Sequence, residues 1–138
     1  MQFNYLPTIR ARFALSRNGP SKALDALEAA NPYELGLPPS PAFSHALYPV
    51  YVRGQAFLAI KSGRQAAAEF QKILDYRGVV FNEPIGALAH VGLARAYALA
   101  ADTTKARAKY QDFFALWKGA DSDIPVLKQA KAEYAGLR

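Results

Sequence analysis

Apolar residues recur at intervals of three and four along most of the chain, the spacing that places side chains on one face of a helix. One such stripe consists of Ala66, Phe70, Ile73 and Leu74. Runs of β-branched residues are short, and no alternation of apolar and polar residues indicates a strand. The pattern therefore predicts an all-α fold.

Short turns interrupt the helical pattern at "NGPSK", "KSGR" and "ADTTK", which are residues 18–22, 61–64 and 101–105. Pro7, Pro49 and Pro84 stand where a first helical turn begins, and proline is tolerated there because its missing N–H has no helical partner. Ser21 and Asp102 are expected to be the N-caps of the helices that follow two of the turns. The chain thus repeats proline, helix, short turn and helix.

Three copies of this unit align on five positions. The positions are Ala11, Ala14, Ala23, Leu27 and Ala30 in the first copy, Gly54, Phe57, Ala66, Phe70 and Ile73 in the second, and Ala94, Tyr97, Ala106, Tyr110 and Phe113 in the third. The intervals between them are 3, 9, 4 and 3 residues in every copy. Small residues at the first and third positions let two helices approach closely, and larger residues fill the space beside them. The agreement indicates an internal duplication.

These spacings resemble the tetratricopeptide repeat (TPR), a helix-turn-helix unit of about 34 residues. The resemblance implies one domain over residues 1–138, built as a right-handed superhelical array of antiparallel helix pairs with repeats at 4–37, 47–80 and 87–120. The linkers are longer than in a standard array, and the extra residues fall in 31–45 and 76–83, where proline and glycine predict loops. Copies two and three lack the terminal proline of the motif, and Arg10 and Arg53 replace its leucine.

The last segment does not begin another pair and is expected to form a capping helix over residues 123–137. Asp123 is its expected N-cap, with Pro125 in the first turn. An apolar stripe that includes Leu127 and Ala130 lies opposite charged residues that include Lys128 and Glu133. One apolar and one polar face are what the end of a helical array needs.

The phrases "LYPVYVRGQAFLA" and "AAAEFQKILDYRG" look like the C-terminal repeat region of bacterial proteins that carry an N-terminal serine/threonine kinase or a winged-helix regulator. The chain has no glycine-rich phosphate loop and no catalytic Asp motif. The resemblance therefore implies a detached or regulatory part of a larger bacterial signalling protein. Relatives with kinases often place such repeats beyond a transmembrane helix, so cytoplasm and periplasm both stay open.

Composition and charge exclude several kinds of site and favour others. The 138 residues include no cysteine, which excludes disulfides and thiolate metal sites. The net charge of +6 is spread as +1, +3 and +2 over residues 1–40, 41–100 and 101–138, as expected for solvated helix faces with pairs such as Glu69 and Lys72. No apolar run is long enough to span a bilayer. We expect a soluble protein that does not insert into membranes or bind nucleic acid.

Catalytic and metal-binding patterns are absent from the sequence. His45 and His90 have no partner at ligand or relay spacing. No serine stands in a glycine-flanked elbow, and the pair Asp121 and Asp123 has no third ligand nearby. We expect no catalytic residue, no metal and no cofactor, and therefore no enzyme.

What remains is a binding surface. In the family, the first helix of each pair lines a concave face on which extended peptides bind. The inward positions fall on Tyr5, Thr8, Arg12, Tyr48, Tyr51, Gln55, Leu88, Val91 and Arg95. Tyrosine and arginine often carry interface energy, so the expected partner is a protein or peptide with acidic and apolar side chains.

Three alternatives to this interpretation stay open. Leu6, Ile9 and Phe13 form an apolar stripe on the first helix, which favours a self-association module and a homo-oligomer. The tyrosines at the inward positions are also suited to covering neighbouring repeats. Nucleic-acid binding is a third hypothesis, and it predicts a steep loss of affinity with salt.

Overall fold

The computed structural model describes residues 4–36 and 47–138, and every regular element in them is a helix. The prediction of an all-α fold is confirmed for these residues. The elements are α1 (Tyr5–Ser16), α2 (Pro20–Leu27), the 3₁₀ helix η1 (Glu28–Tyr33), α3 (Tyr48–Ala59), α4 (Gly63–Asp75), α5 (Arg77–Val80), α6 (Ile85–Leu99), α7 (Thr103–Leu116) and α8 (Pro125–Gly136).

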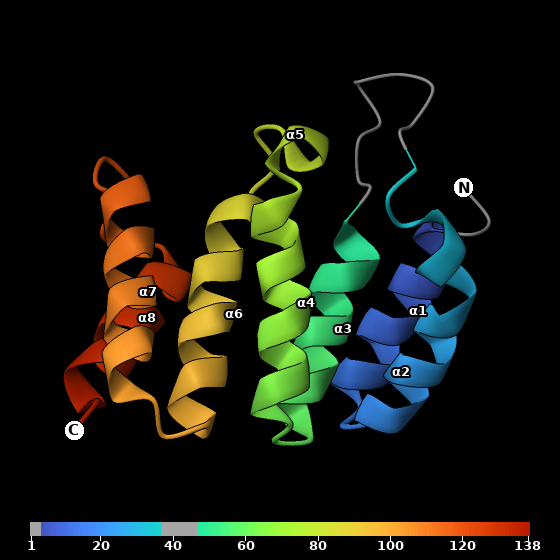
Figure 1. The fold of residues 1–138 in the computed structure, drawn as a ribbon, viewed down its shortest axis with the longest axis horizontal. Coiled ribbons are helices and arrows are strands. Elements are labelled where there is room, and N and C mark those ends of the chain that lie inside the picture. Colours follow the sequence, from blue (N-terminus) through green and yellow to red (C-terminus); the bar gives the residue numbers. More distant parts are fainter. Residues whose placement is uncertain (1–3, 37–46) are drawn as a thin grey trace.

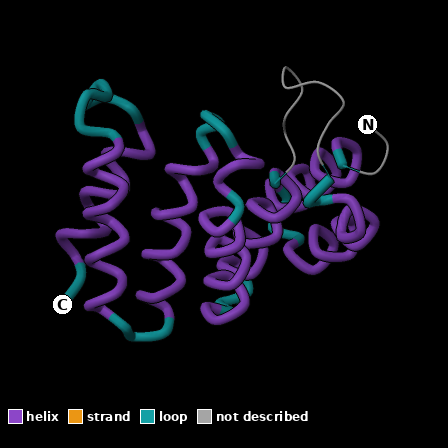
Figure 2. The backbone as a smooth tube through the Cα atoms, turned by 45° about the horizontal axis from the view of Figure 1, so that its top comes forward, coloured by secondary structure: helices purple, strands orange, loops and turns teal. Residues whose placement is uncertain are grey.

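The longer helices stand side by side in chain order, from α1 and α2 at one end to α7 and α8 at the other (Figure 1). Helices α1 and α2, α3 and α4, and α6 and α7 pack against each other, and α3 also packs against α1 and α6. When the molecule is turned, the N-terminal helices are seen nearly end-on while the C-terminal ones are seen from the side (Figure 2). The helix axes therefore rotate along the row.

The aligned positions of the three sequence copies form much of the core. The first, third, fourth and fifth positions are buried in every copy, and the second is half-buried. The fourth and fifth positions of the third copy, Tyr110 and Phe113, are 1% and 0% exposed. Burial thus follows the duplicated pattern, because the same spacing brings the same positions to the contact between consecutive helices.

The three helix-to-helix turns share one backbone conformation. Asn18, Lys61 and Ala101 each lie seven residues after the first aligned position, and their φ angles are 55°, 61° and 59°. In each turn the next amide donates to the carbonyl five residues earlier: Gly19 to Ala14 at 2.9 Å, Ser62 to Phe57 at 2.8 Å, and Asp102 to Tyr97 at 3.0 Å. This is the Schellman arrangement of a helix end. The duplication is therefore present in backbone geometry as well as in sequence.

Two glycines let the helices α3 and α6 approach the ring of Phe70. A Cβ atom on Gly54 of α3 would lie 2.7 Å from Cζ of Phe70, and one on Gly92 of α6 would lie 2.6 Å from the same ring. Phe70 itself is 1% exposed. The sequence predicted the close approach at Gly54 and the filling role of Phe70, but the alignment did not include Gly92.

Of the two N-caps expected after the helix-to-helix turns, one is confirmed and one is wrong. The Asp102 carboxylate accepts a hydrogen bond from the Lys105 amide at 3.0 Å at the start of α7. Ser21 is not a cap, because α2 begins one residue earlier at Pro20. The fixed φ of proline suits the first helical position, so the helix starts there.

The N-cap of the last helix, by contrast, was predicted one residue too early. Helix α8 begins at Pro125 with Ile124 as its N-cap residue, and Asp123 instead pairs with Lys128 at 2.8 Å. Leu127 and Ala130 are buried against the third helix pair, as the apolar stripe predicted. Trp117, at the end of α7, packs in the same cluster.

The two predicted loops contain helical segments. Helix α5 lies within residues 76–83, where Val80 is 4% exposed and anchors the segment to the core. The segment after α2 begins with η1, and Glu34 directly after it is 5% exposed. Residues 37–45 of the first predicted loop, with His45, lie outside the described residues.

A buried ion cluster fixes Glu34 in place. The Arg53 guanidinium of α3 donates to Glu34 at 2.6 Å and lies 2.8 Å from Glu69 of α4, while Lys72 also pairs with Glu34. The expected pair of Glu69 with Lys72 is therefore wrong, because each has a closer partner from another segment. The Arg53 side chain thus links α3 to Glu69 of α4, to Asn31 of η1 and to Glu34, which follows η1.

Candidate functional site

The nine residues predicted to line a binding face lie on α1, α3 and α6. These three helices are neighbours in the row, because α3 packs against both α1 and α6. The structure thus places the predicted residues on adjoining helices, although the first and last of them, Tyr5 and Arg95, are far apart in the sequence. Their side chains fall into three groups that differ in exposure.

The first group is an arginine–tyrosine cluster made of Arg12, Tyr51, Gln55 and Arg95. Arg12 is exposed, and its Nη1 donates to Oε1 of Gln55 at 2.7 Å. Burial raises the pKa of the Tyr51 hydroxyl, while the positive charges of Arg95 and Arg12 oppose the shift. The Tyr51 ring stands edge-on to Phe70 at 5.7 Å, so the core fixes its position. The cluster therefore contains two arginines, of which Arg12 is exposed, beside an aromatic ring whose position the core fixes.

The second group surrounds a hollow of about 300 Å³ between α1 and α3. Its lining consists of Asn4, Tyr5, Thr8, Ile9 and Tyr48. The Thr8 hydroxyl donates to the Asn4 carbonyl at 2.7 Å, and the Tyr48 hydroxyl donates to Glu83 at 3.0 Å. Burial and the bond to Glu83 raise the pKa of Tyr48 to about 12, so its hydroxyl stays protonated at neutral pH. The described part of the lining carries no charged side chain, so the hollow suits an apolar group better than an ion.

Arg95 is engaged within the molecule by the last helix. Its Nε lies 2.9 Å from Oε2 of Glu133, and the Tyr110 hydroxyl donates to the same oxygen at 2.7 Å. Burial alone lowers the pKa of the Arg95 guanidinium, but the hydrogen bond and charge of Glu133 outweigh it and raise the pKa. Glu133 was expected on the polar face of the capping helix, and that expectation is wrong. No local signal identifies its partner, because the two residues are 38 positions apart.

The third group, Leu88 and Val91, belongs to the core. Val91 is 2% exposed and lies in one cluster with Tyr110, Phe113 and Leu127, and Leu88 packs against the same cluster. The prediction that Val91 lines an accessible face is wrong, because α7 and α8 cover this part of α6. The accessible part of the predicted face is therefore formed by α1, α3 and the end of α6 that carries Arg95.

None of the family models, curated protein sequences or solved structures that were compared with the chain matches it. Among residues 4–36 and 47–138, no group of three or more His, Asp or Glu residues is placed to hold a metal ion. None of the helices in these same ranges is long and apolar enough to cross a membrane.

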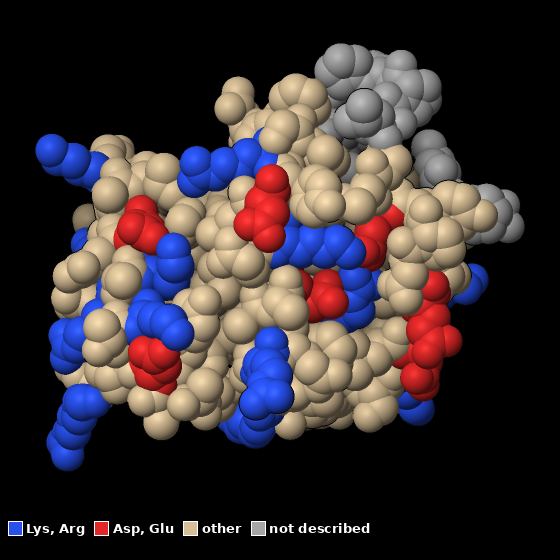
Figure 3. All heavy atoms as spheres, viewed as in Figure 1, with Lys and Arg blue, Asp and Glu red and all other residues tan. Residues whose placement is uncertain are grey.

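The charged side chains on the face shown in Figure 3 alternate in sign. Lysine and arginine side chains lie beside aspartate and glutamate side chains over most of this face (Figure 3). Elsewhere in the described residues, ion pairs such as Arg53 with Glu34 and Lys109 with Asp112, at 2.6 Å and 2.9 Å, join opposite charges. The net charge of +6 is thus not gathered into one basic patch on the described part of this face.

Proposed function

We propose that the chain is a TPR-like right-handed superhelical array of antiparallel helix pairs whose first helices bind a peptide or a segment of a partner protein. The repeated turn conformation at Asn18, Lys61 and Ala101 supports the array. The row of helices with rotating axes also supports it (Figures 1 and 2). The protein acts without catalysis in this proposal, as a detached or regulatory part of a larger bacterial signalling protein.

The arginine–tyrosine cluster is the single observation that carries the binding proposal. Arg12 is exposed and hydrogen-bonded only to a neutral amide among the described residues, so its charge is not neutralised. Arg95 is different, since Glu133 already holds it. In the proposed complex, Arg12 therefore binds the acidic side chain of the ligand. An apolar side chain one or two residues away in the same ligand then enters the hollow beside Tyr5 and Tyr48. The proposed ligand is an extended segment with one acidic and one apolar anchor.

A peptide selected from a random displayed library tests this assignment when it is titrated against matched variants. Arg12→Ala removes the proposed anchor, and Arg10→Ala removes the same charge from a neighbouring exposed position of the same helix. Because a hydrogen bond to a charged group contributes about 1.5–3 kcal/mol, Arg12→Ala is expected to weaken binding roughly tenfold or more. Arg10→Ala is expected to retain the wild-type affinity. Equal affinities of wild type and Arg12→Ala would remove the groove assignment.

Self-association is the second candidate, and the first helix favours it. Leu6, Ile9 and Phe13 are 46%, 62% and 56% exposed along one side of α1. Contiguous exposed apolar side chains of this kind mark interaction surfaces. Sedimentation velocity at rising concentration tests the idea, with Phe13→Glu as the disrupting variant because Phe13 does not line the hollow. A strict monomer at every concentration rules out this candidate.

A further inference from the structure

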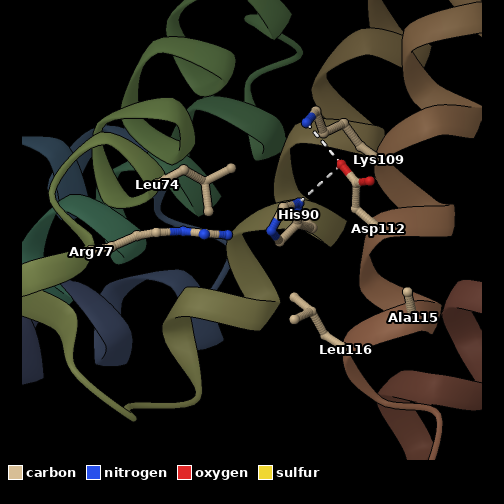
Figure 4. A pocket seen from close by; sticks show the side chains of 7 residues that line it. All are labelled: Leu74, Arg77, His90, Lys109, Asp112, Ala115 and Leu116. Carbon is tan, nitrogen blue, oxygen red and sulfur yellow. Dashed lines mark hydrogen bonds and ion pairs between the residues drawn. The ribbon is translucent and has the colours of Figure 1, made fainter.

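A second hollow, of about 600 Å³, opens where α4, α5, α6 and α7 meet (Figure 4). Seven residues line it: Leu74, Arg77, His90, Lys109, Asp112, Ala115 and Leu116. None of them belongs to the face on α1, α3 and α6 that the sequence predicted. The lining combines two cations, one carboxylate and an imidazole with three apolar side chains.

His90 is the least satisfied polar side chain of this hollow. Its side chain is 7% exposed, and neither ring nitrogen has a hydrogen-bond partner among the described residues. Nδ1 lies 3.5 Å from Oδ2 of Asp112, which is beyond hydrogen-bond distance, and Nζ of Lys109 holds the same oxygen at 2.9 Å. Burial lowers the pKa of His90, against the opposing charge of Asp112. A buried polar group without a partner costs about 1–3 kcal/mol, so a ligand atom that supplies one gains that energy.

Arg77 offers an unpaired positive charge that would attract such a ligand. It is exposed, and no hydrogen bond or ion pair joins its guanidinium to another described residue. Its side chain extends along the hollow toward the His90 ring, while Lys109 and Asp112 approach the ring from the other side (Figure 4). With a neutral imidazole, the two cations exceed the single carboxylate by one charge. The hollow is therefore complementary to an anionic group.

A groove with a mainly apolar lining continues from this hollow. A neighbouring depression of about 520 Å³ shares Leu74, Arg77 and Leu116 with it and is also lined by Phe81 and Trp117. Its polar lining includes Asn82 and Glu83, and the Glu83 carboxylate accepts a hydrogen bond from Tyr48. Phe81 is 62% exposed, and its φ of 52° and ψ of −129° are strained values for a residue with a side chain. The backbone thus holds a large aromatic ring at the surface at an energetic cost. Two connected depressions suit an extended chain better than a single small anion.

We propose that this groove is a second peptide-binding site, which receives an acidic side chain at Arg77 beside His90 and the following bulky apolar side chain against Leu116 and Phe81. The site is independent of the arginine–tyrosine cluster, because the two share no residue. The ligand chemistry follows from the lining: a carboxylate for the unpaired guanidinium, and an apolar side chain for the exposed leucine and phenylalanine. A polar backbone atom of the same peptide is the partner that His90 lacks.

Two capped tripeptides test the proposal by NMR titration of the full chain labelled with ¹⁵N. Acetyl-Leu-Glu-Phe-amide is the ligand probe, and acetyl-Leu-Gln-Phe-amide differs from it only in the charge. The acidic peptide is expected to give saturable shifts of the His90 ring, the Trp117 indole and the amides around Arg77, at peptide concentrations up to about 5 mM. The neutral peptide is expected to bind at least about fivefold more weakly, since a charge-assisted hydrogen bond is lost.

Matched variants locate the contact. Arg77→Ala is expected to reduce the affinity for the acidic peptide about tenfold, and Arg64→Ala, which removes an exposed arginine from the opposite end of α4, is expected to leave it unchanged. Arg12→Ala is also expected to leave it unchanged, which separates this site from the proposed face on α1, α3 and α6. Absence of saturable shifts, equal affinity of the two peptides, or retained affinity in Arg77→Ala would each overturn the proposal.

Discussion

Substitution of Gly92 by alanine tests how tightly the centre of the molecule is packed. Gly92 lies in α6, where a Cβ atom would come within 2.6 Å of three atoms of the Phe70 ring. The ring cannot retreat freely, because it is 1% exposed and meets the backbone of α3 at Gly54. Tyr51 stands edge-on to it at 5.7 Å. The added methyl group must therefore displace a helix or force the ring from its rotamer.

Two effects of opposite sign determine how much Gly92→Ala changes the free energy of unfolding. Alanine in place of glycine inside a helix stabilises by about 1 kcal/mol, because it restricts the unfolded chain. Overpacking of a well-packed core costs about 1–3 kcal/mol. A contact of 2.6 Å with a ring that is enclosed on both sides belongs to the upper part of that range. The expected net result for Gly92→Ala is a loss of about 1–2 kcal/mol of unfolding free energy.

Urea unfolding followed by far-ultraviolet circular dichroism measures this change. With an m-value of about 2 kcal/mol/M, the midpoint is expected to fall by roughly 0.5–1 M. Gly78→Ala is the matched control, because nothing lies within 4 Å of the added atom in α5, and it is expected to stabilise slightly or to be neutral. In a Phe70→Leu background, Gly92→Ala is expected to become neutral or stabilising. A Gly92→Ala protein as stable as wild type in the native background would refute the packing argument.

Three further predictions concern single side chains. Ala101→Gly is expected to raise the thermal midpoint, because glycine adopts the left-handed conformation at φ 59° without strain, a gain of about 1 kcal/mol. Ala98→Gly inside α6 is expected to lower the midpoint. Equal shifts of the same sign in the two variants would contradict this explanation. Arg53→Ala leaves two carboxylates without their shared partner and is expected to destabilise by about 3 kcal/mol in urea unfolding, whereas Arg64→Ala is expected to be neutral. Because the pKa of His90 is lowered in the folded state, the unfolded chain binds the proton more readily, so stability is complete above its ordinary pKa of 6.5 and falls as the pH drops below it. His90→Gln is expected to lose less stability than wild type between pH 7 and 5 in the same assay, and parallel curves would exclude a contribution from His90.

The helical framework was predictable because it depends on local and periodic features. The spacing of small and large apolar residues identified the buried positions in all three copies, including Ala11, Phe70 and Tyr110. The helix-to-helix turns were found for the same reason. The left-handed backbone conformation that these turns share was not predicted, because the residues that adopt it, Asn18, Lys61 and Ala101, have no common side-chain chemistry.

The contacts that define the surfaces depend on residues far apart in the chain. Arg53 meets Glu34 from 19 positions away, and Arg95 meets Glu133 from 38 positions away. Helix periodicity predicts which face of its helix a residue occupies, but it does not predict which charged side chain of another helix contacts that face. For the same reason Val91 was assigned to an open face that the last helices cover.

The hollow around His90 was missed because its lining comes from four helices. The sequence showed a histidine without a partner at ligand or relay spacing, and the structure places Asp112 of α7 at 3.5 Å from it. Arg77 reaches the same place from a helix that was predicted to be a loop. A pocket assembled from such separate segments leaves no pattern of spacing in the sequence.

In the proposed function, α1, α3 and α6 form the peptide-binding face, and chemical-shift mapping with a peptide selected from a displayed library locates the bound ligand. Saturable shifts are predicted at the amides of Thr8, Arg12 and Gln55 and at the Arg12 side chain, and they are predicted to disappear in Arg12→Ala but not in Arg10→Ala. Shifts confined to α2, α4 and α7, with none on α1 and α3, would contradict the account.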